Sequence, residues 1–312
     1  MQGHVSILSV SPEAAAMIAS GGRISTMDGT ADEIYANSLS AGQEKNEKLI
    51  GKVLSSGHTS VLEHCYVNLS FENVSVLAEQ FLIEFRLASF TVKSRRYVDF
   101  SKAGYVSPVF TDNVQMAIFE RTVESLFGTY DVLEAAGVPK EDARFVLPYC
   151  FCSNFFCSMN ARELVHVMNE LAYGRGSRIP ELRALGESLF AQCEQQIPFL
   201  AVRKPEAYRQ PDAFCLRQVQ LLTSKAPVTV LAAPQDAEGL ICGAYQLARG
   251  NVPQPLTKPE QTALLKALLA QPRKRELEQA SYTLLFGGLS LAALTHLTRH
   301  RMQALCAPNL LK

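Results

Sequence analysis

The sequence has 312 residues, 47% of them hydrophobic and 19% charged, so it can bury a sizeable core and is not a disordered tail. Thirty Lys and Arg side chains balance thirty Asp and Glu side chains, which argues against a nucleic-acid binder that relies on bulk positive charge. The longest apolar run, residues 284–294, is too short for a membrane span of roughly 20 residues, and eight cysteines without a framework spacing are typical of reduced thiols. We therefore expect a soluble, cytoplasmic protein that binds neither a membrane nor a nucleic acid.

The N-terminal part of the chain is predicted to form a strand and two helices. The apolar residues 5–10 (VSILSV) predict the strand, and Ser-Pro-Glu then opens a helix over residues 14–20, which Gly21 and Gly22 are expected to stop. A polar stretch follows. Apolar side chains on one face then predict a helix over about residues 44–55.

A strand and two further helices are predicted next. Tyr, Val and Phe are frequent in residues 64–71, which favours a strand. Residues 75–86 have the pattern of an amphipathic helix, and residues 112–136 form a helical segment that stops at Gly137.

Capping signals mark the helices that follow. Asn160 is a typical N-cap for a helix through residue 170, and Pro180 lies in the first turn of a helix that runs to about residue 195. Residues 198–211 have the composition of a linker.

After the linker, the pattern begins again. Residues 219–224 (VQLLTS) repeat the opening strand. A shift of 215 residues lays residues 48–94 on residues 263–309 without a gap, and ten of the 47 pairs are identical.

Two of these identities involve charged residues, which a shared apolar pattern does not explain. Glu63 coincides with Glu278, and Arg86 coincides with Arg301. We therefore predict a tandem organisation. Its parts are one complete domain over residues 1–200, a linker over residues 201–217 and a partial second copy over residues 218–312.

Residues 57–64 (GHTSVLEH) form a polar loop between a helix and a strand. The glycine permits a sharp turn, after which two His, a Thr, a Ser and a Glu fall at the entrance of the strand. Loops of this kind bring polar groups together on a ligand while the scaffold stays rigid. The alternative is a polar turn in which Glu63 and His64 are surface or capping groups.

Basic residues and hydroxyls gather after the next predicted helix. Arg86 is followed by Ser89, and Ser94 precedes Arg95 and Arg96. Two guanidinium groups, a hydroxyl and backbone N–H groups are suited to a phosphate. The alternative is a solvated helix end whose cations are favoured by the helix dipole.

Two further patterns concern metal and thiol chemistry. His296 and His300 have the spacing of metal ligands on one helix face, but no acidic or Cys partner completes a zinc set, so we expect no metal site. Cys150, Cys152 and Cys157 lie in an apolar run and are interpreted as buried thiols.

Four ordered segments resemble the flavin-dependent thymidylate synthases. That family has a GH-x-[ST]-x-x-EH loop followed by R-H-R-x-x-S-x-N-x-x-S-x-R-Y, and residues 57–64 and 84–97 are similar to these motifs. Residues 143–148 and 160–164 are similar to the family's A-R-x-x-L-P and N-A-R-x-L elements, in the same order and spacing. The resemblance covers about residues 3–200 and then begins again after the linker.

The resemblance implies an α+β fold and a homo-oligomer with FAD bound where subunits meet. It implies conversion of dUMP to dTMP with methylenetetrahydrofolate, and NADPH as the reductant of the flavin. The residues that it places against the nucleotide are Ser94, Arg95, Arg96 and Arg144, of which Ser94, Arg96 and Arg144 are the expected catalytic residues. The residues that it places on FAD are His58, Ser60, Arg86, Asn160, Arg162, Arg299, His300 and Arg301.

Both copies depart from the family pattern, in opposite ways. In the first copy the R-H-R triplet is Glu84-Phe85-Arg86, which replaces a cation with an anion and an imidazole with a phenyl ring. The second copy keeps the triplet at residues 299–301 but has lost the loop motif and the later serines.

These reciprocal losses suggest a composite site, in which residues 299–301 of one copy face His58 and Ser60 of the other. The alternative is that both copies are degenerating independently or have changed function. The leading functional hypothesis is FAD-dependent methylation of dUMP. Its alternative is a catalytically degenerate homologue that binds flavin or nucleotide, or a partner subunit.

Overall fold

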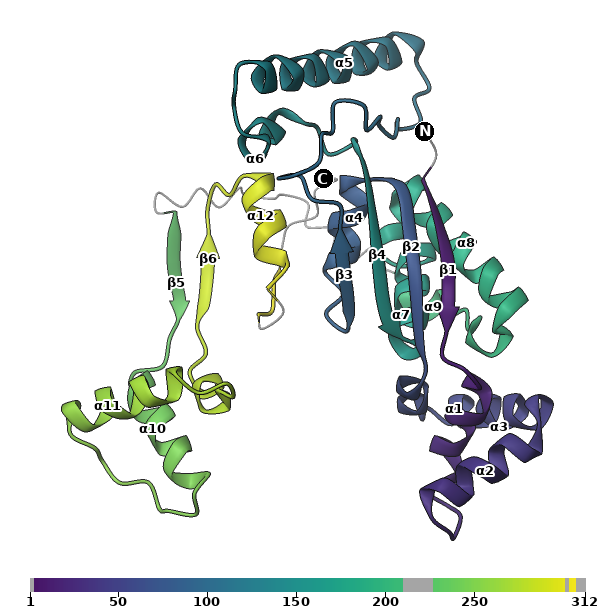
Figure 1. Ribbon diagram of the computed structural model, residues 1–312, viewed down its shortest axis with the longest axis vertical. Coiled ribbons are helices and arrows are strands. Elements are labelled where there is room, and N and C mark those ends of the chain that lie inside the picture. Colours follow the sequence, from purple (N-terminus) through teal and green to yellow (C-terminus); the bar gives the residue numbers. More distant parts are fainter. Residues whose placement is uncertain (1–2, 210–226, 301–302, 307–312) are drawn as a thin grey trace. The chain divides into compact units, whose positions relative to one another are not determined.

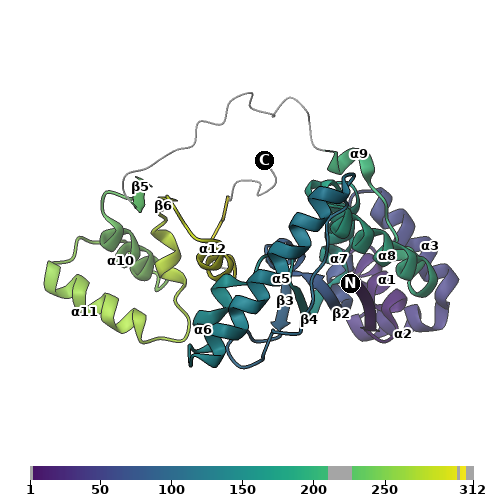
Figure 2. The same ribbon diagram turned by 90° about the horizontal axis from the view of Figure 1, so that it is seen from above.

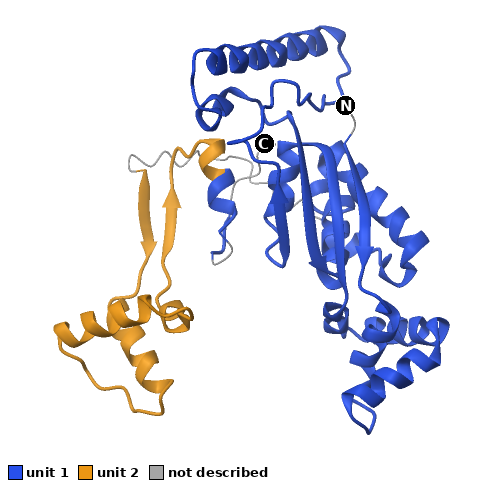
Figure 3. Cartoon of the chain, in the orientation of Figure 1, with its two compact units in different colours: residues 1–214, 295–312 blue, residues 215–294 orange. Residues whose placement is uncertain are grey.

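A computed structural model describes residues 3–209, 227–300 and 303–306. The chain divides into two compact units, residues 1–214 together with 295–312, and residues 215–294 (Figure 3). The strand predicted over residues 219–224 and the side chain of Arg301 lie outside the described residues.

The first unit contains an antiparallel sheet with the strand order β1-β2-β4-β3. Its strands are β1 (His4–Val10), β2 (Tyr66–Ser75), β3 (Ala88–Val92) and β4 (Cys152–Asn160). The turn η1 (Thr59–His64) precedes β2 and helix α4 (Val76–Ile83) follows it. Since a strand rises about 3.3 Å per residue, η1 and α4 lie about 30 Å apart at opposite ends of β2.

Helices cover one face of this sheet, so the fold is mixed α+β as predicted. Figures 1 and 2 show α7 (Ala161–Ala172) and α8 (Pro180–Gln196) side by side on that face. The other helices and turns of the unit are α1 (Ala14–Arg23), α2 (Ala31–Ala41), α3 (Gln43–Ser55), α5 (Asn113–Ala135), α6 (Lys140–Ala143), η2 (Arg144–Val146), η3 (Arg175–Arg178), η4 (Pro198–Leu200) and α9 (Pro205–Tyr208).

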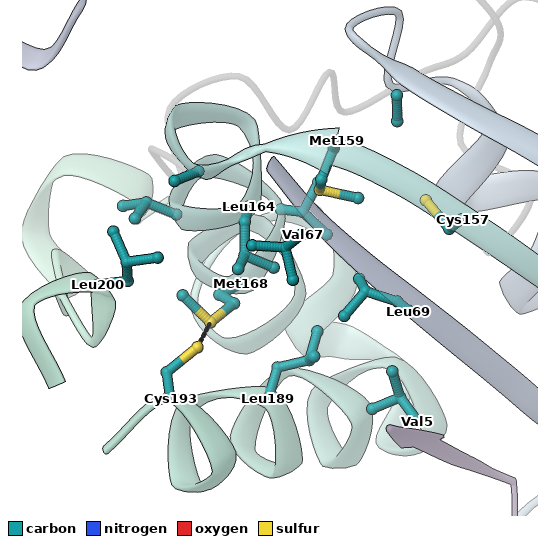
Figure 4. Close-up of a cluster of buried hydrophobic side chains, with 14 of the residues drawn as sticks. Val5, Val67, Leu69, Cys157, Met159, Leu164, Met168, Leu189, Cys193 and Leu200 are labelled. Atoms are coloured by element: carbon teal, nitrogen blue, oxygen red, sulfur yellow. Dashed lines mark hydrogen bonds between the residues drawn. The ribbon is translucent and has the colours of Figure 1, made fainter. Parts of the chain in front are cut away.

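Alternating side chains of β2 build the main core against α7 and α8. Val67 and Leu69 are fully buried, whereas Tyr66 on the opposite face is 55% exposed. Figure 4 shows these two strand residues facing Leu164 of α7 and Leu189 of α8. Complete burial of such a side chain contributes about 1.5–3 kcal/mol, so this layer fixes the position of β2.

The prediction that Gly21 and Gly22 stop the first helix is wrong. Helix α1 continues to Arg23, and both glycines lie close to neighbouring elements. A Cβ on Gly21 would lie 3.0 Å from the His64 ring, and a Cβ on Gly22 would lie 3.2 Å from Val53 Cγ2. The glycines therefore permit α1 to pack closely on η1 and α3.

The polar stretch before residue 42 contains a helix that the apolar pattern does not predict. Helix α2 begins with a capping box, in which Thr30 Oγ1 accepts from Glu33 N and Glu33 Oε2 accepts from Thr30 N. Only Ile34 and Ser38 are buried in this helix, so its apolar periodicity is weak.

The apolar run around residue 152 forms the central strand β4. Cys152 and Cys157 are buried, which confirms their interpretation as core thiols, whereas Cys150 just before the strand is half-buried. Because most of the strand is buried, the alternation that identifies strands in a sequence is lost. The helix predicted over residues 75–86 ends early, at Ile83, because β3 begins at Ala88.

A second, smaller core supports the segment between α4 and β4. Val76 and Phe151 pack there with Tyr130 of α5, which lies beyond the end of the sheet where β2 passes into α4 (Figure 1). Val76 N donates to the Phe151 carbonyl at 3.0 Å, and Leu77 N donates to the Tyr149 carbonyl at 3.1 Å. These bonds fix the start of α4 against the chain that precedes β4.

The described residues of the second unit, from residue 227, form a two-stranded sheet and two complete helices. Its elements are β5 (Val228–Ala232), α10 (Ala237–Leu247), α11 (Lys258–Leu269), η6 (Arg275–Gln279), β6 (Thr283–Phe286) and the start of α12 (Leu291–Thr298). The end of α12, from Thr295, belongs to the first unit. Within the described residues, no helix is long and apolar enough to cross a membrane.

The two-stranded ladder of the second unit has the same register as the first ladder of the first unit. Val228 lies opposite Phe286 in β5 and β6, and Val5 lies opposite Phe71 in β1 and β2. A shift of register follows at the same place in each ladder, between Val230 and Ala232 and between Ile7 and Ser9.

Candidate active site

A fully buried carboxylate lies at the centre of the candidate site. Glu79 belongs to α4, whose N-terminus is capped by the Ser75 side chain. Glu79 Oε2 accepts hydrogen bonds from Arg95 and, at 2.5 Å, from Ser153 Oγ. Glu79 Oε1 accepts from Arg299 Nη2 at 3.2 Å. Such partners are needed because the removal of a carboxylate from water costs several kcal/mol.

Arg95, in the segment after β3, is nearly buried beside Glu79. Its side chain is 10% exposed, and its guanidinium lies over the Phe151 ring at 5.2 Å from the centroid. Its Nε atom is a buried donor that has no hydrogen-bond partner among the described residues. A bound anion is the kind of group that would satisfy such a donor.

Two further arginines lie on neighbouring loop segments and share one acidic residue. Arg96 Nε lies 3.4 Å from Glu141 Oε2, and Arg144 Nε donates to the Glu141 carbonyl at 2.8 Å. Ser94 Oγ accepts from Arg96 N at 3.2 Å, which stabilises the turn after β3. Glu141 of α6 therefore connects the predicted substrate residues of two segments.

The end of α12 is anchored to the same region of the first unit. Thr295 is buried, and its Oγ1 lies 2.7 Å from the Tyr149 hydroxyl. Gln80 Nε2 donates to Thr298 Oγ1 at 2.6 Å. Next to these contacts, Arg144 Nη2 donates to His296 Nε2 at 3.3 Å.

The charges in this region influence one another. Burial lowers the pKa of Arg144, and the charges of Arg95 and Arg96 lower it further. The pKa of His296 is lowered first by partial desolvation and then by Arg144 and Arg299, with smaller effects of Arg96 and Arg95. The cations are thus close enough to repel one another.

We call these groups the arginine cluster. Its members are Arg95, Arg96, Arg144 and Arg299, with the carboxylates of Glu79 and Glu141. Four arginines against two carboxylates leave two positive charges. A phosphate monoester carries about −1.5 to −2 charges at pH 7, and guanidinium forks suit its oxygens. The cluster is therefore complementary to a phosphate.

Two cavities open beside the arginine cluster and share Phe85 and Arg86 in their walls. The smaller, of about 160 Å³, also contacts Phe90 and Arg299. The larger, of about 400 Å³, also contacts His300 and is within the size range of small-molecule sites. Aromatic walls with nearby cations suit a flavin, which becomes anionic when reduced.

Residues 84–86, which occupy the positions of the family's R-H-R triplet, have structural contacts at this cavity wall. Glu84 Oε2 lies 3.1 Å from Arg175 Nη2. Phe85 is buried and meets the His166 ring edge-on at 5.4 Å between centroids. Arg86 is exposed and is the one cation of the triplet.

The other predicted flavin residues lie at the opposite end of β2. His58 and Ser60 are exposed at η1, and Arg162 Nη1 lies 2.5 Å from Glu63 Oε1. Asn160 is buried and caps α7, as predicted. Asn160 also faces Tyr66 at the start of β2, which places this group of residues together.

The expected encounter of Arg299 with His58 and Ser60 is not found within the described part of this chain. Arg299 pairs with Glu79, which follows β2, whereas His58 and Ser60 precede that strand. The length of β2, about 30 Å, separates the two groups. Arg299 instead joins the residues predicted to bind the nucleotide.

The spacing that suggested a histidine pair does not produce one. Helix α12 ends at Thr298, so His296 and His300 do not share a helix face. Across the described ranges, no group of three His, Cys, Asp or Glu side chains is arranged for a metal ion.

Sequence reasoning did not single out Glu79, on which the cluster is centred. The available signal is one carboxylate, followed by Gln80, inside a mostly apolar helical stretch, VLAEQFLI. A charge in such a stretch is buried with partners or faces solvent, and the sequence does not distinguish the two.

Comparisons with known proteins identify the family and agree with the fold. The family described as thymidylate synthase complementing protein matches residues 6–199. The flavin-dependent thymidylate synthase of Nitratidesulfovibrio vulgaris is 31% identical over 256 residues, which cover 78% of this chain and 96% of that protein. The flavin-dependent thymidylate synthase of Geobacter sulfurreducens is 34% identical over 166 residues, which cover 52% of this chain and 70% of that protein.

A solved structure has a similar fold. The UMP/dUMP methylase PolB from Streptomyces cacaoi, bound with 5-Br dUMP, matches with a TM-score of 0.53 and 21% sequence identity, and the match covers 64% of this chain and 93% of that one. The family match spans more than half of the chain and includes the motif at η1, the motif that spans β3, and the motifs at η2 and α7. The chain therefore belongs to the thymidylate synthase complementing protein family, whose two relatives above are named flavin-dependent thymidylate synthases.

Proposed function

We propose that this chain methylates dUMP to dTMP with a bound flavin, the activity for which its relatives are named. The observation that carries the proposal is the convergence of Arg95, Arg96 and Arg144 with His296 and Arg299 in one cluster. The two excess positive charges of this cluster are complementary to the 5′-phosphate of a nucleotide.

The protein's part in this reaction is to bind and orient the nucleotide. Arg96 and Arg144 hold its phosphate, and Ser94 positions it by hydrogen bonding rather than by attack, because no base contacts this serine among the described residues. Arg95 is held by Glu79, so it contributes its charge and the unpaired Nε–H. The same cations stabilise negative charge that develops on the pyrimidine.

The flavin in this proposal is FAD, with NADPH and methylenetetrahydrofolate as co-substrates. When bound, the flavin supplies the hydride chemistry that side chains do not. Arg86 and His300 are the residues of the larger cavity that would hold it. His58, Ser60 and the other residues at η1 and α7 complete the flavin site from a second protomer, because β2 separates them from this cavity within one chain. We therefore propose that the protein is a homo-oligomer. We also propose that it is cytoplasmic.

We include in the proposal a partial second copy over residues 218–312, after a domain over residues 1–200 and a linker over 201–217. The support is a similar order of a strand, helices, a 3-10 turn, a strand and a helix, with three helices before the turn in the first domain and two in the second. Under the shift of 215 residues, α4 and α12 coincide from end to end. The matched register of β1–β2 and β5–β6, including its irregularity, adds to this support.

In the tandem proposal, the second copy supplies cations that the first copy has lost. The shift of 215 residues places Arg299 over Glu84 and His296 over Phe81. Residues of both copies then meet within one chain at the arginine cluster, and not at His58 and Ser60 as the sequence suggested. This arrangement would explain why each copy lacks residues that the other keeps, since both copies contribute to one site.

Glu84 and Phe85 favour a second candidate function, a homologue that binds nucleotide or flavin without methyl transfer. Both side chains contribute structural contacts where the family has a cation and an imidazole. A site that has exchanged catalytic groups for packing retains binding more readily than turnover.

The purified protein tests both candidates. The proposal predicts a yellow protein, or one that takes up FAD when dUMP is added, and formation of dTMP from dUMP with methylenetetrahydrofolate and NADPH. It also predicts rescue of a thymidine-requiring bacterial strain. Flavin uptake without dTMP supports the second candidate, and a colourless protein that takes up no FAD contradicts a flavoenzyme.

A further inference from the structure

His296 lies beside the arginine cluster, and it differs from the arginines because the charge of a histidine changes near neutral pH. Its Nε2 accepts a hydrogen bond from Arg144 Nη2 at 3.3 Å. A guanidinium only donates, so this nitrogen carries no proton and the ring is the neutral Nδ1–H form. In the free protein, His296 is therefore an uncharged group among cations.

The groups that face His296 come from every neighbouring element. The cations are Arg144 from η2, Arg95 and Arg96 from the segment after β3, and Arg299 after α12. The carboxylates nearby are each paired with an arginine: Glu79 with Arg95 and Arg299, and Glu141 with Arg96. The hydroxyl of Tyr149 forms a hydrogen bond with Thr295, which lies on α12 like His296. These surroundings oppose a positive charge on the imidazole as long as no anion is bound.

We propose that His296 is a phosphate-positioning residue that takes up one proton from solvent when the phosphate group of a nucleotide binds in the arginine cluster. The identity of the nucleotide, dUMP, rests on the proposed function. The binding of a phosphate group at this position does not. A phosphate dianion cancels the excess positive charge of the cluster, so Nε2 becomes protonated and donates to a phosphate oxygen instead of accepting from Arg144. No bond in the ligand is made or broken.

The direction of the pH dependence follows from linkage. The pKa of His296 is lowered in the free protein, and the dianion raises it in the complex. Between these two values binding consumes a proton, so the association constant increases as the pH falls, by up to about tenfold per pH unit. The second ionisation of the phosphate, near pH 6, acts in the opposite direction, and it is the same for all variants.

The experiment is calorimetric titration of the full-length protein with dUMP, with deoxyuridine and with inorganic phosphate. Each titration is repeated in two buffers of different ionisation enthalpy, at several pH values between about 6.5 and 8, which gives the protons taken up. The test variant is His296→Gln, which keeps an N–H donor but does not titrate. The control is His4→Gln, because His4 is an exposed histidine of β1, 3.4 Å from Glu72. Circular dichroism checks that each variant is folded.

The expected result is that the wild type and His4→Gln take up as much as one proton more than His296→Gln on binding dUMP, and that deoxyuridine causes no such difference. If only inorganic phosphate binds, with the same difference, the inference stands and the proposed function fails. If dUMP binds with equal proton uptake in all three proteins, the inference is overturned and the proposed function is unaffected. If only inorganic phosphate binds, with equal proton uptake in all three proteins, both are overturned. Absence of binding by both anions overturns both.

Discussion

The guanidinium of Arg299 lies 3.2 Å from the fully buried carboxylate of Glu79, across 220 residues of sequence. This pair joins the segment after α12 to helix α4, and Glu79 also binds Arg95 on its other oxygen. One carboxylate therefore holds two cations of the proposed phosphate site in place. The following predictions depend on this arrangement and on the core beneath it.

Replacement Glu79→Gln is expected to lower the free energy of unfolding by about 3–5 kcal/mol, because it leaves the nearly buried Arg95 without its counter-charge. Urea unfolding followed by circular dichroism measures the change. Glu141→Gln is the control, since Glu141 is half exposed and its pair with Arg96 contributes less than about 1 kcal/mol. Equal effects of the two variants would show that Glu79 is not the central counter-ion.

Replacement Arg144→Gln is expected to weaken dUMP binding by about 10- to 100-fold, the equivalent of one charge-assisted hydrogen bond of about 1.5–3 kcal/mol. Arg183→Gln on α8 removes the same charge from an exposed position outside the arginine cluster and should leave the affinity unchanged. Calorimetric titration gives both affinities. A similar loss in the two variants would mean that only net charge matters.

The close packing of α7 on α8 can be tested by replacing glycines with alanine and measuring the stability of the protein. A Cβ on Gly186 would lie 2.8 Å from Leu171 Cβ and 2.9 Å from Ala172 N, so Gly186→Ala should destabilise the protein by about 1–3 kcal/mol. Gly128 of α5 has no neighbour within 4 Å of the same position, so Gly128→Ala should stabilise it by about 0.5–1 kcal/mol. Thermal unfolding should show shifts of opposite sign, and shifts of the same sign would contradict the close packing.

Thiol labelling tests the core directly. Burial raises the pKa of the Cys157 and Cys193 thiols to about 12, whereas Cys306 is exposed. The thiolate is the reactive form, so we expect an alkylating reagent at about pH 8 to modify Cys306 in the native protein and the two core thiols only after unfolding. Peptide mass mapping identifies the labelled sites. Native labelling of Cys157 would mean that β4 is not covered as described.

The sequence by itself determined the elements whose signals are local. Asn160 and Pro180 start α7 and α8 because capping and a fixed φ act within one turn. The ordered motifs were sufficient to indicate the family, since each is a short run of residues. Burial of Cys152 and Cys157 followed from the apolar run around them.

Only the tertiary structure decided which of these local pieces meet. Gly21 and Gly22 lie inside helix α1, where η1 and α3 approach them closely. The two glycines alone do not show that these elements approach. The rigid length of β2 separates His58 from Arg299, although both were assigned to one cofactor. Long-range pairing instead places Arg299 on Glu79 and His296 beside Arg144, because burial of a carboxylate requires partners from whichever segments reach it.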